Sequence, residues 1–471
     1  MKRSLFFLFS LLFWVSNSEG KVKLSSVLGN HMVLQQHSLV KLSGRADLNT
    51  TVKIITSWDN KTYLASVEKD GTWNVEVVTQ VAGGPYTITF NDGDLLTLCD
   101  IYLGEVWLCS GQSNMAMPMK GFGAQPVFQS NEVIANVDER LPIRLFTVER
   151  AASKTCLDEC KGDWKLHTSE NVADFSATAY FFGYQLYRSL HVPIGLIQTS
   201  WGGSKIESWM SPESLDIYPE ISRKHLMDNV TPEQPHRLAS MLYNAMLYPL
   251  KDVCFKGWIW YQGEANRNDA DLYQKLLCTF VEDWRTLFKK KDLPFYYVQI
   301  APFDYKEKPL SGALLREAQF NCEKKIPHSG MTVLMDAGDS ACIHPAHKQK
   351  AGERLAYWAL SKTYEKKAIG AASPRYVSKQ INGSKVTLFF ENTFLGLTSY
   401  GETLSCFEVA GEDGVYYQAE ARIVNKSSVE VWSKKVVCPA AVRYAFKDYV
   451  KGDLYGTNGL PVSSFRTEPH F

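Results

Sequence analysis

Residues 104–115 read GEVWLCSGQSNM, an apolar run that stops abruptly at a polar Ser-Gly-Gln-Ser-Asn segment. This pattern predicts a buried strand that enters a tight turn before a helix. Gly111 allows the backbone to turn sharply and lets a bound molecule approach closely. A serine on such a turn, Ser113, would project its hydroxyl above the carboxyl edge of a sheet. A polar turn without chemistry has the same local pattern, so the rest of the chain must decide between the two.

The region 100–364 alternates apolar strand patterns with amphipathic helix patterns. The strand patterns fall at 106–108, 194–197, 258–261, 295–300 and 332–335, and the helix patterns at 177–190, 273–288 and 347–360. Strands that are apolar throughout and alternate with helices indicate a parallel sheet that is covered on both faces. We therefore predict an α/β domain here.

β-rich sequence flanks this region on both sides. Between residues 21 and 99, strand patterns at 52–55, 73–78 and 86–90 are separated by Gly- and Asn-rich turn signals. This spacing is typical of a small antiparallel β-sandwich. Strand patterns return at 385–390 and 428–432. We therefore predict an N-terminal β-sandwich domain over 21–99, an α/β domain over 100–364 and a C-terminal β-rich domain over 365–471.

Residues 1–20 have the composition of a signal peptide. Lys2 and Arg3 precede an apolar stretch, 5–15, that is too short to span a bilayer, and small residues follow it. We expect export to a periplasmic, extracellular or secretory compartment. No later run of eighteen apolar residues occurs, so no membrane span is expected in the mature chain.

Charge and cysteine content exclude several classes of partner. The net charge is +1 and no long basic run occurs, which argues against nucleic acid and anionic membranes. The ten cysteines include no Cys-x-x-Cys, so we expect no structural zinc and no cofactor. Cys156 could pair with Cys160, and Cys406 with Cys438, or each could be a free thiol.

Four chemically rich loops follow strands of the α/β region. They are the Ser113 turn, TSWGGS at 199–204, WYQGEAN at 260–266 and DAGDSACIHP at 336–345. In an open α/β sheet, ligands bind beyond the carboxyl ends of the strands, so these loops should meet there. Together they supply a serine, a histidine, carboxylates and backbone N–H groups, which are the parts that acyl transfer needs.

The same segments, together with IGLI at 194–197 and IESW at 206–209, resemble those of the sialate O-acetylesterases, a group of SGNH-type carbohydrate esterases. The resemblance implies an SGNH-hydrolase-like fold and removal of acetyl groups from sialic acids such as 9-O-acetyl sialate. It also implies that Ser113 is the nucleophile and His344 the general base. The backbone N–H groups of Ser113 and of Gly202 or Gly203 would then hold the oxyanion, with the side chain of Gln262.

A third catalytic residue is less clearly marked. The wider SGNH group often places an aspartate three residues before the catalytic histidine, and Ala341 occupies that position here. We expect Asp339 to orient His344, because residues 340–343 give the chain room to turn its carboxylate back onto the imidazole. Asp336, nearer the end of its strand, would cap the turn instead. A Ser–His pair without a carboxylate is the remaining alternative.

Other residues at these loops have more than one interpretation. Glu264 and Arg316 are candidates for substrate binding, although Arg316 could equally form a surface ion pair with Glu317. His347 could join His344 in a metal site, but it is better explained as the start of a helix. A glycosidase using Glu207 and Glu264 is a rival function. A closer rival keeps the esterase chemistry and changes the substrate, as in an acetylxylan or other polysaccharide deacetylase.

Overall fold

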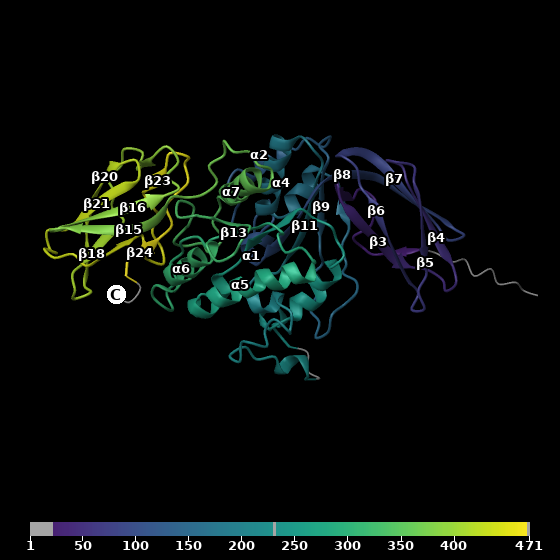
Figure 1. The fold of residues 1–471 in the computed structure, drawn as a ribbon, viewed down its shortest axis with the longest axis horizontal. Coiled ribbons are helices and arrows are strands. Elements are labelled where there is room, and N and C mark those ends of the chain that lie inside the picture. Colours follow the sequence, from purple (N-terminus) through teal and green to yellow (C-terminus); the bar gives the residue numbers. More distant parts are fainter. Residues whose placement is uncertain (1–21, 229–231, 469–471) are drawn as a thin grey trace, which may run out of the picture.

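The computed structural model describes residues 22–228 and 232–468, which form three parts in a row (Figure 1). An N-terminal β part, a central α/β part and a C-terminal β part follow one another along the longest axis. The predicted parallel sheet flanked by helices, with β-rich regions on both sides, is confirmed. The expected signal peptide, 1–20, lies outside the described residues.

The N-terminal part packs two sheets against each other. One sheet contains β1 (Lys23–Leu24), β3 (Leu39–Arg45) and β6 (Thr72–Val78). The other contains β2 (Val33–Gln35), β4 (Thr51–Thr56), β5 (Thr62–Ser66), β7 (Gly83–Asn91) and the start of β8 (Leu95–Gly111). The rings of Trp73 and Phe90, one from each sheet, lie 5.8 Å apart between centroids. All three strands predicted in this region are present.

Strand β8 is 17 residues long and belongs to both of the first two parts. Its first half pairs with β7 and β2, and its second half pairs in parallel with β11 (Ile194–Ser200) and β12 (Gly257–Tyr261). The boundary expected between residues 99 and 100 therefore falls inside a continuous strand. Gly111 is in register with Ser200 on one side and Tyr261 on the other, so the three strands end together.

The central sheet has the strand order β10-β9-β11-β8-β12-β13-β14. All neighbours are parallel except β10, which is antiparallel to β9. Strand β14 ends earlier than expected, because Val333 to Met335 are buried in a loop and their apolar character imitates a strand. The remaining strands of this sheet are β9 (Ile143–Thr147), β10 (Trp164–Lys165), β13 (Phe295–Val298) and β14 (Ser329–Thr332).

Long helices cover both faces of this sheet. Helices α4 (Ala177–Leu190) and α7 (Lys348–Trp358) pack together on one face, and α5 (Ala270–Leu287) and α6 (Ser311–Glu323) on the other (Figure 1). The three predicted helices are confirmed within a few residues at each end. We did not predict α6, whose Ser-Gly start and mixed polarity hide its helical period.

Short helices occur mainly in the loops at the sheet edges. The α-helical ones are α1 (Ser113–Ala116), α2 (Ser130–Ala135) and α3 (Ser169–Asp174). The others are η1 (Ile206–Trp209), η2 (Lys224–Leu226), η3 (Pro235–Arg237), η4 (Tyr243–Leu247), η5 (Tyr248–Leu250), η6 (Glu264–Asn266) and η7 (Ala359–Thr363).

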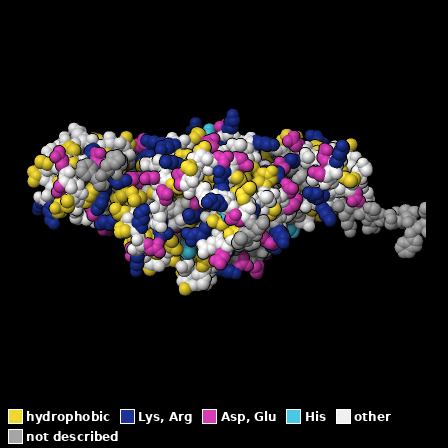
Figure 2. All heavy atoms as spheres, turned by 90° about the horizontal axis from the view of Figure 1, so that it is seen from below, with side chains coloured by type: hydrophobic (Ala, Val, Ile, Leu, Met, Phe, Trp, Pro, Cys, Tyr) yellow, Lys and Arg dark blue, Asp and Glu magenta, His cyan; other side chains and the backbone are white. Residues whose placement is uncertain are grey.

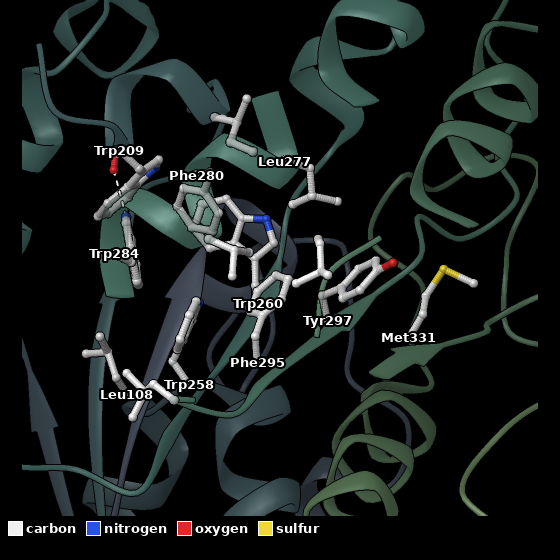
Figure 3. Packing of buried hydrophobic residues seen from close by; sticks show 14 of the residues in the cluster. Leu108, Trp209, Trp258, Trp260, Leu277, Phe280, Trp284, Phe295, Tyr297 and Met331 are labelled. Carbon is white, nitrogen blue, oxygen red and sulfur yellow. Dashed lines mark hydrogen bonds between the residues drawn. The ribbon is translucent and has the colours of Figure 1, made fainter. Parts of the chain in front are cut away.

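A tryptophan cluster packs β12 against α5 (Figure 3). Trp260 lies 4.5 Å from Phe280 between ring centroids, and Trp258 lies 5.6 Å from Trp284. The indole of Trp284 also donates a hydrogen bond of 2.9 Å to the carbonyl of Trp209 in η1. Large rings in close contact bury much apolar area, so this cluster fixes both the end of β12 and the segment that follows β11.

The C-terminal part is a second β-sandwich. Its sheets have the orders β15-β16-β21-β20 and β19-β18-β22-β24, with a small pair β17-β23 beside them. The strands are β15 (Arg375–Asn382), β16 (Lys385–Glu391), β17 (Leu397–Thr398), β18 (Phe407–Ala410), β19 (Tyr416–Gln418), β20 (Glu420–Asn425), β21 (Ser428–Trp432), β22 (Ala441–Tyr444), β23 (Tyr455–Gly456) and β24 (Phe465–Arg466). Tyr376 stacks on Phe465 at 4.7 Å and so joins the two sheets. Both predicted strands are present.

The ten cysteines all lie in the described residues and are free thiols, so of the two alternatives left open by the sequence this structure has the unpaired one. The sulfurs of Cys278 in α5 and Cys322 in α6 lie 3.8 Å apart.

On the face seen in Figure 2, basic and acidic side chains are interspersed. Among the described residues, no helix has both the length and the apolar character to cross a membrane.

Arg316 of α6 attaches the C-terminal part to the central domain. It is fully buried, and its guanidinium donates to Ser464 Oγ at 3.1 Å, to the carbonyl of Asp448 at 3.3 Å and to the carbonyl of Lys447. One residue further on, Glu317 forms an ion pair with Arg466. The assignment of Arg316 to substrate binding is therefore corrected, because its donors are taken up between domains and not at a surface.

Replacing Arg316 with methionine should weaken this attachment. The change removes the hydrogen bonds that the buried guanidinium makes to the hydroxyl of Ser464 and to the part-buried carbonyls of Lys447 and Asp448, which costs on the order of 2–3 kcal/mol. We expect a melting temperature several degrees below that of the wild type in differential scanning fluorimetry. Arg422→Met, at an exposed position of the C-terminal domain, is the matched control and should melt like the wild type. Equal melting temperatures for both variants would contradict the role of Arg316.

Candidate active site

The turn that carries Ser113 is held at the ends of β8 and β12. Gly111 has φ of 145°, and a Cβ built there would lie 2.2 Å from the carbonyl oxygen of Tyr261. Only glycine fits such an approach. The N–H of Gln112 donates to the same carbonyl at 3.0 Å. Ser113 then begins α1, as the sequence predicted for a strand, a tight turn and a helix.

The loop after β11 lies directly against Ser113. A Cβ built on Gly202 would be 3.4 Å from Ser113 Cβ, and Gly203 has φ of 74°. The N–H of Trp201 donates to the carbonyl of Gly111 at 3.2 Å, which fixes the loop to the turn that carries Ser113. Within the described part of the chain, the N–H groups of Gly202 and Gly203 donate no hydrogen bond. They are therefore free to bind a developing negative charge.

The loop of His344 is tied to the residue that follows Ser113. Asn114 Nδ2 donates to the carbonyl of Ile343 at 3.2 Å. Lys348 Nζ bridges the other side, with 2.8 Å to Asn114 Oδ1 and 2.6 Å to the carbonyl of Pro345. The two residues that flank His344 in the sequence are thus held to Asn114, Ile343 directly and Pro345 through Lys348. The structure therefore brings the Ser113 and His344 segments together.

The imidazole of His344 is oriented by an amide. Nδ1 lies 2.6 Å from Gln125 Oε1, and the ring packs edge-on against Phe122 at 5.4 Å. Because an amide oxygen only accepts, the ring hydrogen lies on Nδ1 and Nε2 is left as the base. Burial and the nearby charge of Lys348 lower the pKa of His344 to about 4. The imidazole is therefore neutral at physiological pH, as a general base must be.

Neither candidate aspartate is bonded to His344. Asp339 is exposed, and its Oδ1 accepts the backbone N–H groups of Ala341, at 2.7 Å, and of Cys342. Burial favours a raised pKa for Asp336, but hydrogen bonds and charges from Arg354 and Lys350 outweigh it and lower the pKa to about 2. The expectation that Asp339 orients His344 is corrected, because its carboxylate closes its own turn and Gln125 occupies that place.

Gln262 does not contribute a free oxyanion donor either. Its side chain is fully buried, and Nε2 donates to the carbonyl of Ser204 at 3.0 Å and to Asn266 Oδ1 at 2.8 Å. Both amide hydrogens are therefore used. Asn266 in turn accepts from the N–H of Ile206. Gln262 holds the loops after β11 and β12 together instead of contacting the reacting group.

Glu264 lies under the site and not in it. It is 3 % exposed; its Oε1 accepts from Asn114 Nδ2 at 2.6 Å, and its Oε2 has no partner among the described residues. Burial raises the pKa of this carboxyl. Glu207, beside a cavity of about 450 Å³, accepts from Asn266 Nδ2. The glycosidase alternative therefore lacks an accessible pair of carboxylates.

His347 does not share the environment of His344. It is exposed at the start of α7, where its ring lies 4.8 Å from Phe128. Its interpretation as the start of a helix is confirmed, because it is the N-cap residue directly before α7. Residues 22–228 and 232–468 contain no group of three or more His, Cys, Asp or Glu side chains that could hold a metal ion.

Sequence reasoning missed three residues of the site: Gln125, Asn114 and Lys348. Gln125 lies in an irregular loop far from His344 in the sequence, so no spacing connects them. Asn114 was included in the motif, but its side-chain contacts depend on the folded loop. Lys348 is charged and opens an amphipathic helix, a position that normally indicates exposure.

Comparison with known proteins identifies a family to which the chain is similar. The family described as "Carbohydrate esterase, sialic acid-specific acetylesterase" matches residues 103–361. Sialate O-acetylesterase of Homo sapiens is 30% identical over 428 residues, covering 83% of this chain and 79% of that protein. The Mus musculus protein of that name is 29% identical over 447 residues, covering 82% and 80%.

A solved structure extends the agreement to the whole fold. A carbohydrate acetylesterase from Xanthomonas citri superposes with a TM-score of 0.86 at 31% sequence identity. The match covers 95% of this chain and 100% of that one, so it includes both flanking β parts. The chain is therefore an esterase and belongs to the family of sialic acid-specific acetylesterases among the carbohydrate esterases.

Proposed function

We propose that this esterase removes O-acetyl groups from sialic acids, with Ser113 as nucleophile and His344 as general base. The observation that carries the mechanism is the attachment of both neighbours of His344 to Asn114, directly after Ser113. Gly202 and Gly203 stand at the same sheet edge with free N–H groups. The sialic acid substrate is supported by the family description and by the names of the curated relatives.

The first half of the reaction forms an acetyl-enzyme. Nε2 of His344 accepts the hydroxyl proton of Ser113 while Oγ attacks the acetyl carbonyl. The negative charge that develops on the carbonyl oxygen is bound by the N–H groups of Ser113 and of Gly202 or Gly203. Collapse of the intermediate breaks the bond to the sugar oxygen, which leaves with the proton that His344 held.

The second half releases acetate. Water gives a proton to His344 and attacks the acetyl carbon, and the same N–H groups bind the second oxyanion. Collapse of this intermediate returns the proton to Ser113 Oγ and frees acetic acid. Gln125 keeps the hydrogen of His344 on Nδ1 in both halves, so that Nε2 always faces the reaction.

Substitution of Ser113 by alanine should abolish acetate release without unfolding the protein. Loss of the nucleophile in such a site costs about 10⁴-fold or more in rate. The measurement is release of acetate from 9-O-acetyl N-acetylneuraminic acid, with circular dichroism to compare the folds. A folded Ser113→Ala variant with activity near that of the wild type would contradict the nucleophile.

The substrate is tested separately with a panel. We expect kcat/KM for 9-O-acetyl N-acetylneuraminic acid to exceed that for acetylated xylan and for a neutral O-acetylated monosaccharide. Acetylated xylan is included because the solved relative from Xanthomonas citri is a carbohydrate acetylesterase. Faster hydrolysis of xylan would favour a polysaccharide deacetylase and leave the Ser113 result unaffected.

Variants of Gln125 and Asp339 distinguish which of these two residues orients His344. Gln125→Ala should lower kcat by about tenfold to a hundredfold, because the imidazole loses its orienting acceptor. Asp339→Asn should stay within about threefold of the wild type, since Asp339 contacts only its own turn. Hydrolysis of 4-nitrophenyl acetate measures both. A large loss in Asp339→Asn with none in Gln125→Ala would restore the aspartate to this role.

We also propose that the enzyme acts after export, on the basis of the basic and apolar composition of residues 1–20. Protein recovered from outside the cytoplasm should begin between Ser18 and Lys21 in N-terminal sequencing. Recovery of the intact N-terminus there would contradict cleavage.

A further inference from the structure

Lys348 is a buried lysine beneath the site. It is the first residue of α7 and is 1 % exposed, although lysine side chains are almost never fully buried without a partner. Its Nζ has two oxygen acceptors, Asn114 Oδ1 and the carbonyl of Pro345. One ammonium group therefore joins the nucleophile turn to the histidine loop.

Asn114 is the centre of this network. Its Nδ2 donates to Glu264 Oε1 and to the carbonyl of Ile343, while its Oδ1 accepts from Lys348. Its own carbonyl accepts from Thr178 Oγ1 at 3.0 Å, which anchors the turn to α4. The side-chain amide is thus bonded at both ends, and Asn114 cannot move without breaking contacts to two other loops.

The charged and titratable groups around Lys348 come from two elements besides its own. Glu264 faces it from η6, across Asn114, and Cys342 and His344 face it from the loop before α7. On α7 itself, Lys350 and Arg354 are engaged by Asp336. Glu264 is therefore the counter-charge of Lys348, and His344 is the group on which the lysine charge acts.

We propose that Lys348 is a positioning residue, which sets the geometry between Ser113 and His344 through Asn114. The inference rests on the proposed Ser113–His344 mechanism and adds to it a residue that touches neither the substrate nor Ser113.

The electrostatics agree with this geometry. Burial lowers the pKa of Lys348 to about 7, against the opposing effect of Glu264. After burial, the charge of Lys348 is the second cause that lowers the pKa of His344. Removing that charge should raise the pKa of His344 towards its ordinary value. The acid limb of the kcat/KM profile should then move to higher pH, because the base is protonated sooner as the pH falls.

Lys348→Met tests both effects, because methionine keeps much of the length of the side chain and removes its charge and donors. We expect kcat for 4-nitrophenyl acetate to fall about tenfold to a hundredfold, KM to stay within about threefold, and the acid limb to move to higher pH. Lys350→Met is the matched control, since Lys350 lies on the same helix and pairs with Asp336. It should have the kcat and acid limb of the wild type.

Asn114→Ala separates positioning from charge. It removes the connection but leaves the lysine charge in place, so kcat should fall while the acid limb stays where it is. This variant also decides the question if Lys348→Met does not fold, as judged by circular dichroism.

Wild-type kcat in Asn114→Ala, or in a folded Lys348→Met with an unmoved acid limb, would overturn the proposal. Equal losses in Lys350→Met would do the same. Because 4-nitrophenyl acetate needs no sugar recognition, these results are independent of the substrate, and only the Ser113→Ala result tests the nucleophile.

Discussion

Hydrogen bonding of β8 on both sides is the constraint on which the rest of the site depends. Strand β8 is paired with β11 and β12 along its second half, and all three end at the level of Gly111. The close approach of Tyr261 to Gly111 leaves no room for a side chain there. The chain must therefore turn at this point, and Ser113 is placed between the loops of the two neighbouring strands.

The site differs from a full serine triad in the charge beside the histidine. An amide holds the ring of His344, and among the described residues no carboxylate is bonded to it, so in the proposed mechanism the imidazolium lacks the anion of a triad. Two buried charges, Lys348 and Glu264, are joined through Asn114 to the backbone of the loop that carries His344. The neutral form of His344 is thus favoured before the reaction. The positive charge that the ring gains during attack is balanced by the negative charge of the oxyanion.

Much of the fold could be read from the sequence, and the reason is physical. Strands such as 258–261 are apolar throughout and helices such as 177–190 have an amphipathic pattern, and both occur as predicted. The end of β14 was misjudged because buried loop residues imitate a strand. Helix α6 was missed because it buries polar residues such as Arg316 and Gln319, which obscures its helical period. The roles proposed for Ser113, His344 and Gly202 were suggested by local signals, which are glycines and polar residues at strand ends. Gln125 and Lys348 were missed because their roles depend on contacts between segments more than two hundred residues apart.

Helix α6 connects the C-terminal domain to the centre of the enzyme. Arg316 binds backbone carbonyls of that domain, while Gln319, one turn later, donates to the carbonyl of Gln262 at 3.1 Å and accepts from the N–H of Ile300. Every residue assigned to the reaction precedes residue 364, yet the strand end that carries Gln262 is supported through this helix. A gene cut short after the central domain would therefore still encode every group assigned to the reaction, but the buried guanidinium of Arg316, on the helix that supports Gln262, would lose its acceptors.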